Sequence, residues 1–285
     1  MIIDHPLHEL LKPAIREGVT AALAEDIGSG DVSAALVPPS ELAAATIVCR
    51  QPAVLCGIPW VNETFLHCDP DSEIQWFLAD ADKVEAGTIL AEVRGSARAL
   101  LSAERTALNF LQTLSGTATL SSQYARLVAH THVKLLDTRK TIPGLRLAQK
   151  YAVRCGGCYN HRTGLYDAFL IKENHILAAG SIRKAVAAAR SLAPDLSIEV
   201  EVENFQELVT ALESQVDTIL LDNFTLDDMR QAVNECAGRA RLEASGNINM
   251  TNVAEVAETG VDCISIGDLT KRILPIDLSM RFTTP

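Results

Sequence analysis

The chain has 285 residues and a formal net charge of -11 at pH 7, and 48% of its residues are hydrophobic while 21% are charged. This composition excludes a disordered protein and leaves room for one large or two ordinary domains. The acidic charge argues against a nucleic-acid surface, which would need a basic stripe. No apolar run reaches the ~18–20 residues that cross a bilayer, so we expect no membrane span.

The first half of the chain predicts a mixed α/β unit. Apolar residues recur at helical spacing over Leu7–Ala24, and a turn-rich loop follows. A long helix is predicted over Glu104–His130, with Ser102 as its N-cap. Between these helices, short apolar runs bounded by glycine and proline predict strands over Ala45–Cys49, Ala53–Leu55, Glu73–Leu78 and Ile89–Val93.

After the long helix, apolar strands alternate with helical segments. Strands are predicted over Val133–Asp137, Ala168–Lys172, Ile198–Val202, Thr218–Asp222, Arg241–Ala244 and Cys263–Ile266. Helices are predicted over Ser181–Ser191, Phe205–Ser214, Leu226–Cys236 and Val253–Thr259. Repeated βα units imply parallel strands buried on both faces. A barrel is favoured over an open doubly wound sheet, because every strand end carries a polar group and these groups must converge.

The ends of the predicted strands carry the candidate site, since the active site of a (β/α) barrel lies at the carboxyl ends of its strands. Four cations occur there or in the loops that follow, and Arg and Lys side chains bind carboxylates and phosphates. In a chain this acidic, such a cluster indicates a ligand with several negative charges. The strand-end residues and the loop cations are Asp137, Thr138, Arg139, Lys140, His161, Arg162, Lys172, Glu201, Asp222, Ser245-Gly246-Asn247 and Ile266-Gly267-Asp268.

Two carboxylates and two glycine turns add to this pattern. Glu201 and Asp222 end successive strands, so they could share Mg²⁺ with a phosphorylated substrate, although a solvated strand face is the alternative. Backbone N–H groups around Gly246 and Gly267 could hold phosphate. His161 could donate to an anionic ligand or transfer a proton, but a lone loop histidine is more often structural.

The cysteines and the start of the chain point to a cytoplasmic protein. The seven cysteines are scattered and odd in number, which suits reduced thiols better than a disulfide framework. Residues 1–13 contain no cationic segment and no long apolar segment, so we expect no secretory signal. Cys155 and Cys158 form a CxxC pair, but a zinc or redox function is a minor alternative because no second ligand pair stands out.

Several segments together resemble the quinolinate phosphoribosyltransferase family in its bacterial form. The most specific one is NHRTGLYDAFLIKENH at 160–175. The resemblance runs nearly end to end and also covers EDIGSGDVS at 25–33, SAERTALNFLQTLSGTAT at 102–119, DTRKTIPGLR at 137–146, EVEVEN at 199–204, ILLDNF at 219–224, EASGNI at 243–248 and GVDCISIGDLTK at 260–271. The family usually has a glycine where Cys158 stands, which concerns local backbone freedom and indicates that the CxxC is incidental.

The resemblance implies an N-terminal α/β sandwich domain, residues 1–112, and an open, incomplete (β/α) barrel, residues 113–285, whose C-terminal tail can return to the first domain. It implies a homodimer in which the sandwich of one subunit covers the barrel mouth of the other, so that Arg105 reaches the partner's site. The implied reaction is Mg²⁺-dependent: quinolinate and phosphoribosyl pyrophosphate give nicotinate mononucleotide, pyrophosphate and CO₂, in de novo NAD biosynthesis.

On this pattern the strand-end residues divide between the two substrates. Quinolinate, a dicarboxylate, suits Arg105, Arg139, His161, Arg162 and Lys172. Phosphoribosyl pyrophosphate suits Thr138, Lys140 and the glycine turns, with Glu201 and Asp222 on Mg²⁺ or the ribose. The expected catalytic residues are Lys140, Lys172, Glu201 and Asp222.

Two other functions remain open on the same residues. Lys172 could form a Schiff base in an aldolase-like barrel, which borohydride would trap in the presence of a carbonyl substrate. The chain could also be a molybdenum-associated relative on the same scaffold. The presence of Arg105, Arg139, Arg162 and Lys172 together argues against that second alternative.

Overall fold

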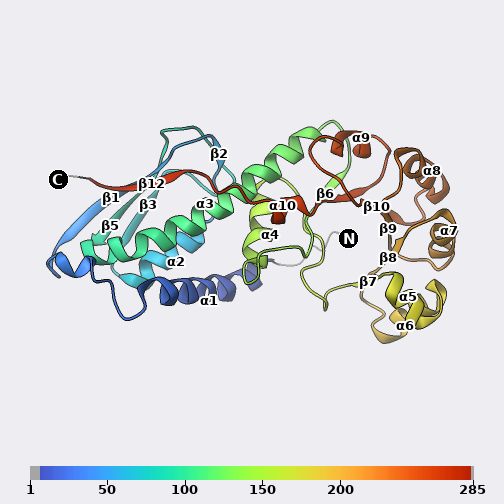
Figure 1. The fold of residues 1–285 in the computed structure, drawn as a ribbon, viewed down its shortest axis with the longest axis horizontal. Helices are drawn as coiled ribbons and strands as arrows, with labels where there is room; N and C mark the ends of the chain where they lie inside the picture. Colours follow the sequence, from blue (N-terminus) through green and yellow to red (C-terminus); the bar gives the residue numbers. More distant parts are fainter. Residues whose placement is uncertain (1–6, 284–285) are drawn as a thin grey trace. The chain divides into compact units, whose positions relative to one another are not determined.

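The computed structural model describes residues 7–283, so residues 1–6, which are part of the segment predicted to lack a secretory signal, lie outside it (Figure 1). The described chain forms two compact units. Of the described residues, the sandwich unit comprises 7–122, 141–157 and 272–283, and the barrel unit comprises 123–140 and 158–271. The chain thus passes between the units repeatedly, and the single boundary after residue 112 stays a prediction.

The sandwich unit contains an antiparallel sheet of four strands in the order β12-β1-β5-β3. The strand bounds are β1 (Leu42–Cys49), β3 (Glu73–Trp76), β5 (Ile89–Ser96) and β12 (Leu278–Thr283), and β2 (Ala53–Val54) pairs separately with β4 (Lys83–Val84). The helices are α1 (Leu7–Ile27), η1 (Ala34–Leu36), α2 (Ile58–Cys68), α4 (Arg146–Cys155) and the first part of α3 (Ala97–Leu127).

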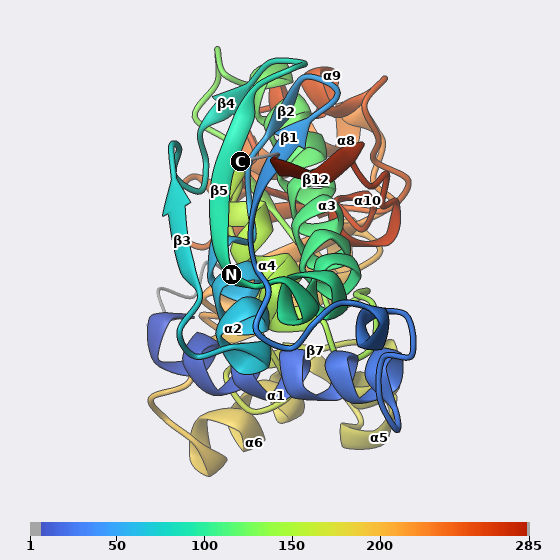
Figure 2. The same ribbon diagram turned by 90° about the vertical axis from the view of Figure 1, so that its left-hand side faces the viewer.

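One face of this sheet carries the core of the sandwich unit. Ala45, Ile47 and Cys49 alternate along β1 and are fully buried, as the two-residue period of a strand requires. They pack with Phe65 of α2 and Leu108 of α3. Figure 2 looks onto the sheet, with α2 and α3 behind the strands.

The barrel unit contains six parallel strands in the order β6-β11-β10-β9-β8-β7. Since β6 and β7 follow each other in the chain but form the two edges, the order is that of a ring left open between them. This confirms the predicted open, incomplete barrel. The strands are β6 (Lys134–Leu136), β7 (Phe169–Ile171), β8 (Ile198–Val202), β9 (Thr218–Asp222), β10 (Arg241–Ser245) and β11 (Cys263–Ser265). The helices are α5 (Glu173–Ala179), α6 (Ile182–Leu192), α7 (Phe205–Glu213), α8 (Leu226–Cys236), α9 (Val253–Ala257) and α10 (Asp268–Lys271).

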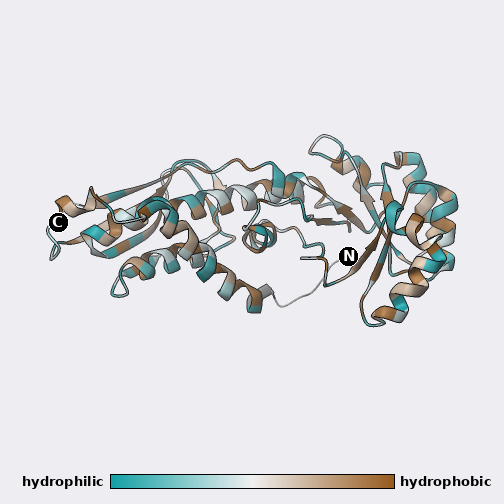
Figure 3. Cartoon of the chain, turned by 60° about the horizontal axis from the view of Figure 1, so that its bottom comes forward, coloured by the Kyte–Doolittle hydropathy of each residue, from teal (hydrophilic) through white to brown (hydrophobic). Residues whose placement is uncertain are grey.

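The register of the parallel strands separates two faces. Val200, Leu221 and Ala244 share the outer face, which α7 and α8 cover in Figure 1. The strands are largely brown in Figure 3, while the helices outside them mix teal and brown, as amphipathic helices on an apolar sheet do. The inner face instead carries Glu199 on β8 and Glu243 on β10. The outer face therefore supplies the apolar core, and the inner face is left for polar groups.

The predicted elements are confirmed, with one correction at the long helix. The observed bounds of β8, β9 and α8 equal the predicted ones. The long helix α3 begins at Ala97, because Leu100 and Ala103 continue its buried face toward the N-terminus, so the prediction of Ser102 as N-cap was wrong. Ser102 lies within α3 and donates from Oγ to Asp31 Oδ2 at 2.9 Å. Among the described helices, none combines the length and apolar character of a membrane span.

Candidate active site

The carboxyl ends of the parallel strands form one edge of the barrel unit, and the structure brings most predicted site residues to it. Thr138, Arg139 and Lys140 follow β6, Lys172 follows β7, and Ile266 follows β11. Glu201 lies one residue before the end of β8, while Asp222 and Ser245 are the last residues of β9 and β10. Arg105 is the exception, since it is exposed on α3 within the sandwich unit.

Lys172 and Glu201 form an ion pair at this edge. The pairing of Ile171 with Val200 makes the next residues of β7 and β8 neighbours, and Lys172 Nζ lies 2.5 Å from Glu201 Oε2. The Lys172 side chain is 44% exposed, whereas Glu201 is 15% exposed. An ammonium group has three donors, so Lys172 can bind an external anion while it keeps this contact.

Arg162 is buried beside a second guanidinium. Arg162 is only 7% exposed. Its Nη1 donates to Ala168 O at 3.0 Å. Within residues 7–283, its Nε has no hydrogen-bond partner. Burial and the nearby Arg139 charge lower the pKa of the Arg162 guanidinium. Two neighbouring guanidinium groups repel each other, so this arrangement suits an anionic ligand between or beside them.

The loop that carries Arg162 is fixed by two buried carboxylates. Asp167 accepts the N–H groups of Thr163 and Gly164 at 2.6 and 3.2 Å. Asp137, at the end of β6, accepts the His161 N–H at 2.9 Å and the Asn160 side-chain amide at 2.6 Å. The sequence did not assign these roles, because neither contact follows from spacing in the chain. The two carboxylates hold the loop that carries Arg162 against the strand ends.

His161 lies inside the barrel with both ring nitrogens in contact with the protein. The Arg162 N–H donates to Nδ1 at 2.8 Å, and Nε2 lies 3.0 Å from Glu199 Oε2 and 3.5 Å from Glu243 Oε1. Both glutamates are 0% exposed. Burial acts most strongly on Glu199 and would raise its pKa, but the contact with His161 and the nearby Arg162 charge act against burial, and the pKa lies below its usual range. A role for His161 as a direct substrate ligand stays a prediction.

His161, Glu199 and Glu243 are also close enough to suggest a metal centre, since one ligand atom from each lies within 4.8 Å of the others. The geometry at Nδ1 opposes that interpretation. Because Nδ1 accepts a backbone N–H, the ring proton belongs on Nε2, and a protonated nitrogen cannot bind a metal. The arrangement suits an imidazole N–H held between two carboxylates.

Glycine turns follow β10 and β11, as the sequence predicts. Gly246 has φ +98° and Asn247 has φ +52°, so the turn after β10 uses left-handed backbone. A side chain on Gly267 would meet Lys271 Cε at 3.1 Å and Lys140 Cδ at 3.5 Å. Two lysine side chains therefore flank the Gly267 backbone, and Asp268 begins α10 beside it. Lys271 is not among the residues that the sequence predicts for the site, and its signal in the sequence was its place at the end of the segment GDLTK.

Lys140 is held in place through its backbone. Thr138 Oγ1 accepts the Lys140 N–H at 3.0 Å, and Thr270 Oγ1 donates to the Lys140 carbonyl at 2.8 Å. The Ile266 N–H donates to Leu136 O at 2.9 Å, which ties the loop after β11 to β6. These contacts fix the backbone of Lys140, from which its exposed side chain extends near Gly267.

Cys158 needs no glycine conformation. The left-handed residue in this segment is Gly157, with φ +87°, and Cys158 is not among the residues with positive φ. Burial, with a smaller contribution from Asp137, raises the pKa of the Cys158 thiol to about 12. Within the described chain, the group of potential metal ligands contains neither cysteine of the CxxC pair. That the pair is incidental to the site stays a prediction.

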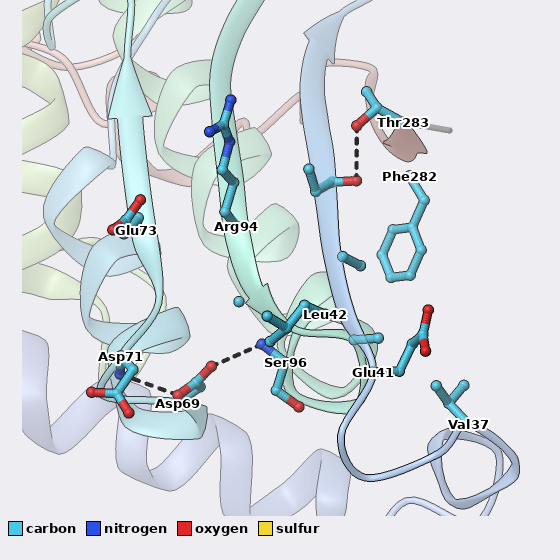
Figure 4. Close-up of a pocket in the computed structure, with 14 residues that line it drawn as sticks. Val37, Glu41, Leu42, Asp69, Asp71, Glu73, Arg94, Ser96, Phe282 and Thr283 are labelled. Carbon is cyan, nitrogen blue, oxygen red and sulfur yellow. Dashed lines mark hydrogen bonds between the residues drawn. The ribbon is translucent and has the colours of Figure 1, made fainter. Parts of the chain in front are cut away.

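A hollow in the sandwich unit lies along β1, β5 and the end of β12 (Figure 4). Its charged lining is mostly acidic, with Asp69, Asp71 and Glu73 near a single cation, Arg94. Hydrogen bonds from the backbone of Ser96 and Asp71 lower the pKa of Asp69, which keeps this carboxylate ionised. An acidic hollow opposes a polyanionic ligand, and none of the predicted site residues lines it.

Comparisons with known proteins identify the family of the chain. The family models described as quinolinate phosphoribosyl transferase, N-terminal and C-terminal domain, match residues 31–115 and 117–281. A probable nicotinate-nucleotide pyrophosphorylase (carboxylating) of Synechocystis is 43% identical over 263 residues, 91% of this chain and 89% of that protein. A relative from Bacillus subtilis with the same description is 40% identical over 260 residues, 91% of this chain and 90% of that protein. The solved nicotinate-nucleotide pyrophosphorylase of Francisella tularensis has a TM-score of 0.93 and 47% identity, and the match covers 95% of this chain and 96% of that one. The chain belongs to the quinolinate phosphoribosyl transferase family.

Proposed function

We propose that this chain transfers the phosphoribosyl group of phosphoribosyl pyrophosphate to quinolinate, with release of pyrophosphate and CO₂ and formation of nicotinate mononucleotide for NAD biosynthesis. The observation that carries the proposal is Arg162, buried beside Arg139, whose Nε has no partner within residues 7–283. Membership of the family and the names of its relatives support the same reaction.

Quinolinate fits the cationic side of the edge. Its two carboxylates supply the charge that Arg139 and Arg162 need when water is excluded, and Lys172 can hold a third contact. The Lys172 ammonium is engaged by Glu201, whereas a Schiff-base lysine must attack as a free amine. The ion pair therefore favours carboxylate binding over aldolase chemistry.

Phosphoribosyl pyrophosphate fits the other side. The turns at Gly246 and Gly267 offer backbone N–H groups, and Lys140 and Lys271 flank Gly267. Glu201 and Asp222 provide oxygen donors on the same face of adjacent strands, because Glu201 is level with Leu220, two residues before Asp222. Oxygen donors of this kind fit Mg²⁺, which would help to neutralise the departing pyrophosphate.

The chemistry needs no covalent nucleophile from the protein. The pyridine nitrogen forms a bond to the ribose C1, and the C1–O bond to pyrophosphate breaks with its electron pair on the leaving oxygen. Positive charge develops on the ribose, where Glu201 and Asp222 can offset it. The ring nitrogen is then cationic, so it stabilises the electron pair left at C2 when CO₂ departs, and C2 takes up a proton.

We infer that the active form is a homodimer in the cytoplasm. Arg105 is exposed on the sandwich unit, and the family resemblance assigns it to the partner's quinolinate. All seven cysteines are free thiols, which suits a reducing compartment. Mixing Arg105→Ala with Lys172→Ala subunits should restore activity, since a heterodimer then holds one intact site. No recovery after confirmed subunit exchange would oppose the shared site.

The assay that tests the function is direct. Purified protein with quinolinate, phosphoribosyl pyrophosphate and Mg²⁺ should yield equal amounts of CO₂ and nicotinate mononucleotide. Nicotinate, which has one carboxylate, should be a poor substrate because a single carboxylate cannot offset the charge of both neighbouring guanidinium groups. Comparable turnover of nicotinate and quinolinate, or borohydride trapping of Lys172 with a carbonyl substrate, would overturn the assignment. Absence of product would favour the molybdenum-associated alternative.

A further inference from the structure

We propose that Asn223 is a positioning residue that ties the Asp222 carboxylate to the phosphate turn 245–247, so that the ribose and phosphate contacts form as one unit. This inference rests on the proposed function, since it assigns a ligand to both groups. Asn223 follows β9 directly, next to the turn that follows β10. It was not among the site residues that the sequence predicts, because the loop it contacts lies more than twenty residues further along the chain.

The backbone of Asn223 is fixed in an unusual conformation. Its φ is +55°, in the left-handed region that asparagine tolerates better than most residues other than glycine. Its N–H donates to Ser245 O at 3.0 Å, which extends the pairing of β9 with β10 by one contact beyond the strand ends. The left-handed turn therefore aims the side chain along the edge where Asp222 and Ser245 end.

The side-chain amide of Asn223 makes two contacts of opposite kind. Nδ2 donates to Asp222 Oδ2 at 2.9 Å, and Oδ1 accepts from Asn247 Nδ2 at 3.2 Å. An amide can do both because it carries a donor and an acceptor, whereas an ionised carboxylate is an acceptor only. Asn223 therefore joins the carboxylate that faces the ribose to the turn that faces the phosphate.

The turn also packs tightly against this amide. A Cβ atom on Gly246 would lie 2.2 Å from Asn223 Oδ1, and Gly246 has φ +98°. Both facts require glycine at this position, and the first shows that the amide occupies the space a side chain would take. The path of the 245–247 backbone is therefore shaped to Asn223.

Loss of the amide should have a selective effect on one substrate. Asp222 would lose a donor that orients its carboxylate, and Asn247 would lose its contact across the turn. Misplacement of a catalytic group by about an ångström can cost on the order of 10²-fold in rate. We expect a smaller effect, about tenfold in both KM for phosphoribosyl pyrophosphate and kcat, because the backbone contact to Ser245 O remains. KM for quinolinate should stay within about twofold.

The test uses two variants and a matched control in the full-length protein. Asn223→Gly removes the amide and keeps access to positive φ, and Asn223→Asp keeps the shape but places a second carboxylate beside Asp222. Gln215→Gly is the control, since Gln215 has the same φ of +55° and lies before β9, at the opposite end of that strand. Both Asn223 variants should show the selective rise in KM and the fall in kcat, and Gln215→Gly should show neither.

A double-mutant cycle separates positioning from general stability. Asn247→Ala breaks the same contact from the other side, so the double variant Asn223→Gly, Asn247→Ala should be less impaired than the product of the two single effects. Calorimetric titration with phosphoribosyl pyrophosphate alone should give a Kd about tenfold weaker for Asn223→Gly.

The outcomes are distinguishable from failure of the proposed function. A wild-type protein that makes no nicotinate mononucleotide refutes the function itself. A wild type that turns over, with folded Asn223 variants within about twofold of it, overturns the positioning role. Equal rises in KM for both substrates, or strictly multiplicative single effects, would also overturn it.

Discussion

In both sheets of this protein, side chains alternate between the two faces of each strand. The buried side chains compared here are apolar in the sandwich unit and charged inside the barrel unit. In the sandwich unit, the inward positions of β1 hold Ala45, Ile47 and Cys49 under α2 and α3. In the barrel unit, the inner positions of β8 and β10 hold Glu199 and Glu243, which are equally inaccessible to solvent. The difference arises because the barrel strands have a second, apolar face that packs against helices. That outer face can drive folding, so the inner face is free to carry charge.

Burying charge has a cost that the sandwich unit avoids. A buried ionised group is destabilising unless it is paired, and even a paired one is often no better than an apolar residue of the same size. The barrel unit accepts this cost around His161 and Arg162. Variants that remove its charges should therefore lose activity without a matching loss of stability, and variants in the sandwich core should do the opposite.

The largest effect is expected at Arg162. Arg162→Met keeps much of the side-chain volume and removes the cation, so quinolinate loses its buried partner. Truncating one member of a buried charge pair costs about 2–5 kcal/mol, or roughly 30- to 5,000-fold in kcat/KM for quinolinate. Removing one of two repelling guanidiniums should keep Tm within about 2–4 °C of the wild type.

Steady-state kinetics and calorimetry on the same preparation measure both quantities. Arg183→Met is the matched control, because Arg183 is an exposed cation of the barrel unit paired with Glu213. Arg183→Met should change neither kcat/KM for quinolinate nor Tm appreciably. A large drop in Tm for Arg162→Met with little loss of activity would contradict the proposed difference between the buried charges of the barrel unit and the core of the sandwich unit.

Glu201 should show the next largest effect, and on a different kinetic constant. Glu201→Gln removes the charge that offsets the ribose cation and weakens the pair with Lys172. Loss of such an electrostatic partner typically lowers kcat by about 10²-fold or more. Glu203→Gln is the control, since Glu203 is exposed two residues further along the chain. With both substrates varied, near-normal kcat for Glu201→Gln at saturating Mg²⁺ would refute this role.

The parts of the fold that sequence could predict are those with a local pattern. The bounds of β8 and β9 follow from short runs rich in β-branched and aliphatic residues, and those of α8 follow from apolar residues at helical spacing. Helix α5 was missed, and none of its residues is buried, so it has no apolar stripe to recognise. The start of α3 was misplaced because Ser102, a good N-cap type, lies within the helix and binds Asp31 instead.

The site residues divide in the same way, into those with a local sequence pattern and those without one. Strand ends can be read from sequence, so Lys172, Glu201 and Asp222 were found as neighbours at one edge. The partners of His161 could not be found that way, because Glu199 and Glu243 meet it only through the register of three strands. Lys271 and Asn223 belong to the same class, since their neighbours come from other strands. Short-range pattern predicts which residues reach an edge, and register decides which of them touch.

In the sandwich unit, stability should respond and catalysis should not. Ile47→Ala removes a fully buried side chain from β1 and leaves a cavity, which costs about 2–5 kcal/mol. Thermal melts should show a Tm lower by several degrees, while kcat/KM of the folded fraction stays within about twofold. Ile47→Val should give a smaller drop, about 0.5–1.5 kcal/mol. A change in kcat/KM as large as that at Glu201 would mean that the sandwich core shapes the site directly.

The smallest effect concerns a surface carboxylate of the sandwich unit. Asp31 accepts N–H bonds from Ala34 and Ser33 at 2.9 Å each and a hydroxyl bond from Ser102, and these bonds lower its pKa from the ordinary value of 3.8. A carboxyl whose pKa is lowered by folding adds stability that is fully present above its unfolded pKa and is lost as the pH falls through the folded one.

Asp31→Asn should therefore lower Tm slightly at pH 7, and the difference from wild type should shrink once the pH falls below 3.8. Asp26→Asn, an exposed change on α1, is the control and should show no such convergence in melts across the acid range. If the Asp31→Asn difference instead grew toward low pH, the hydrogen bonds would not be stabilising the ionised form, and the loop's attachment to α3 would need another cause.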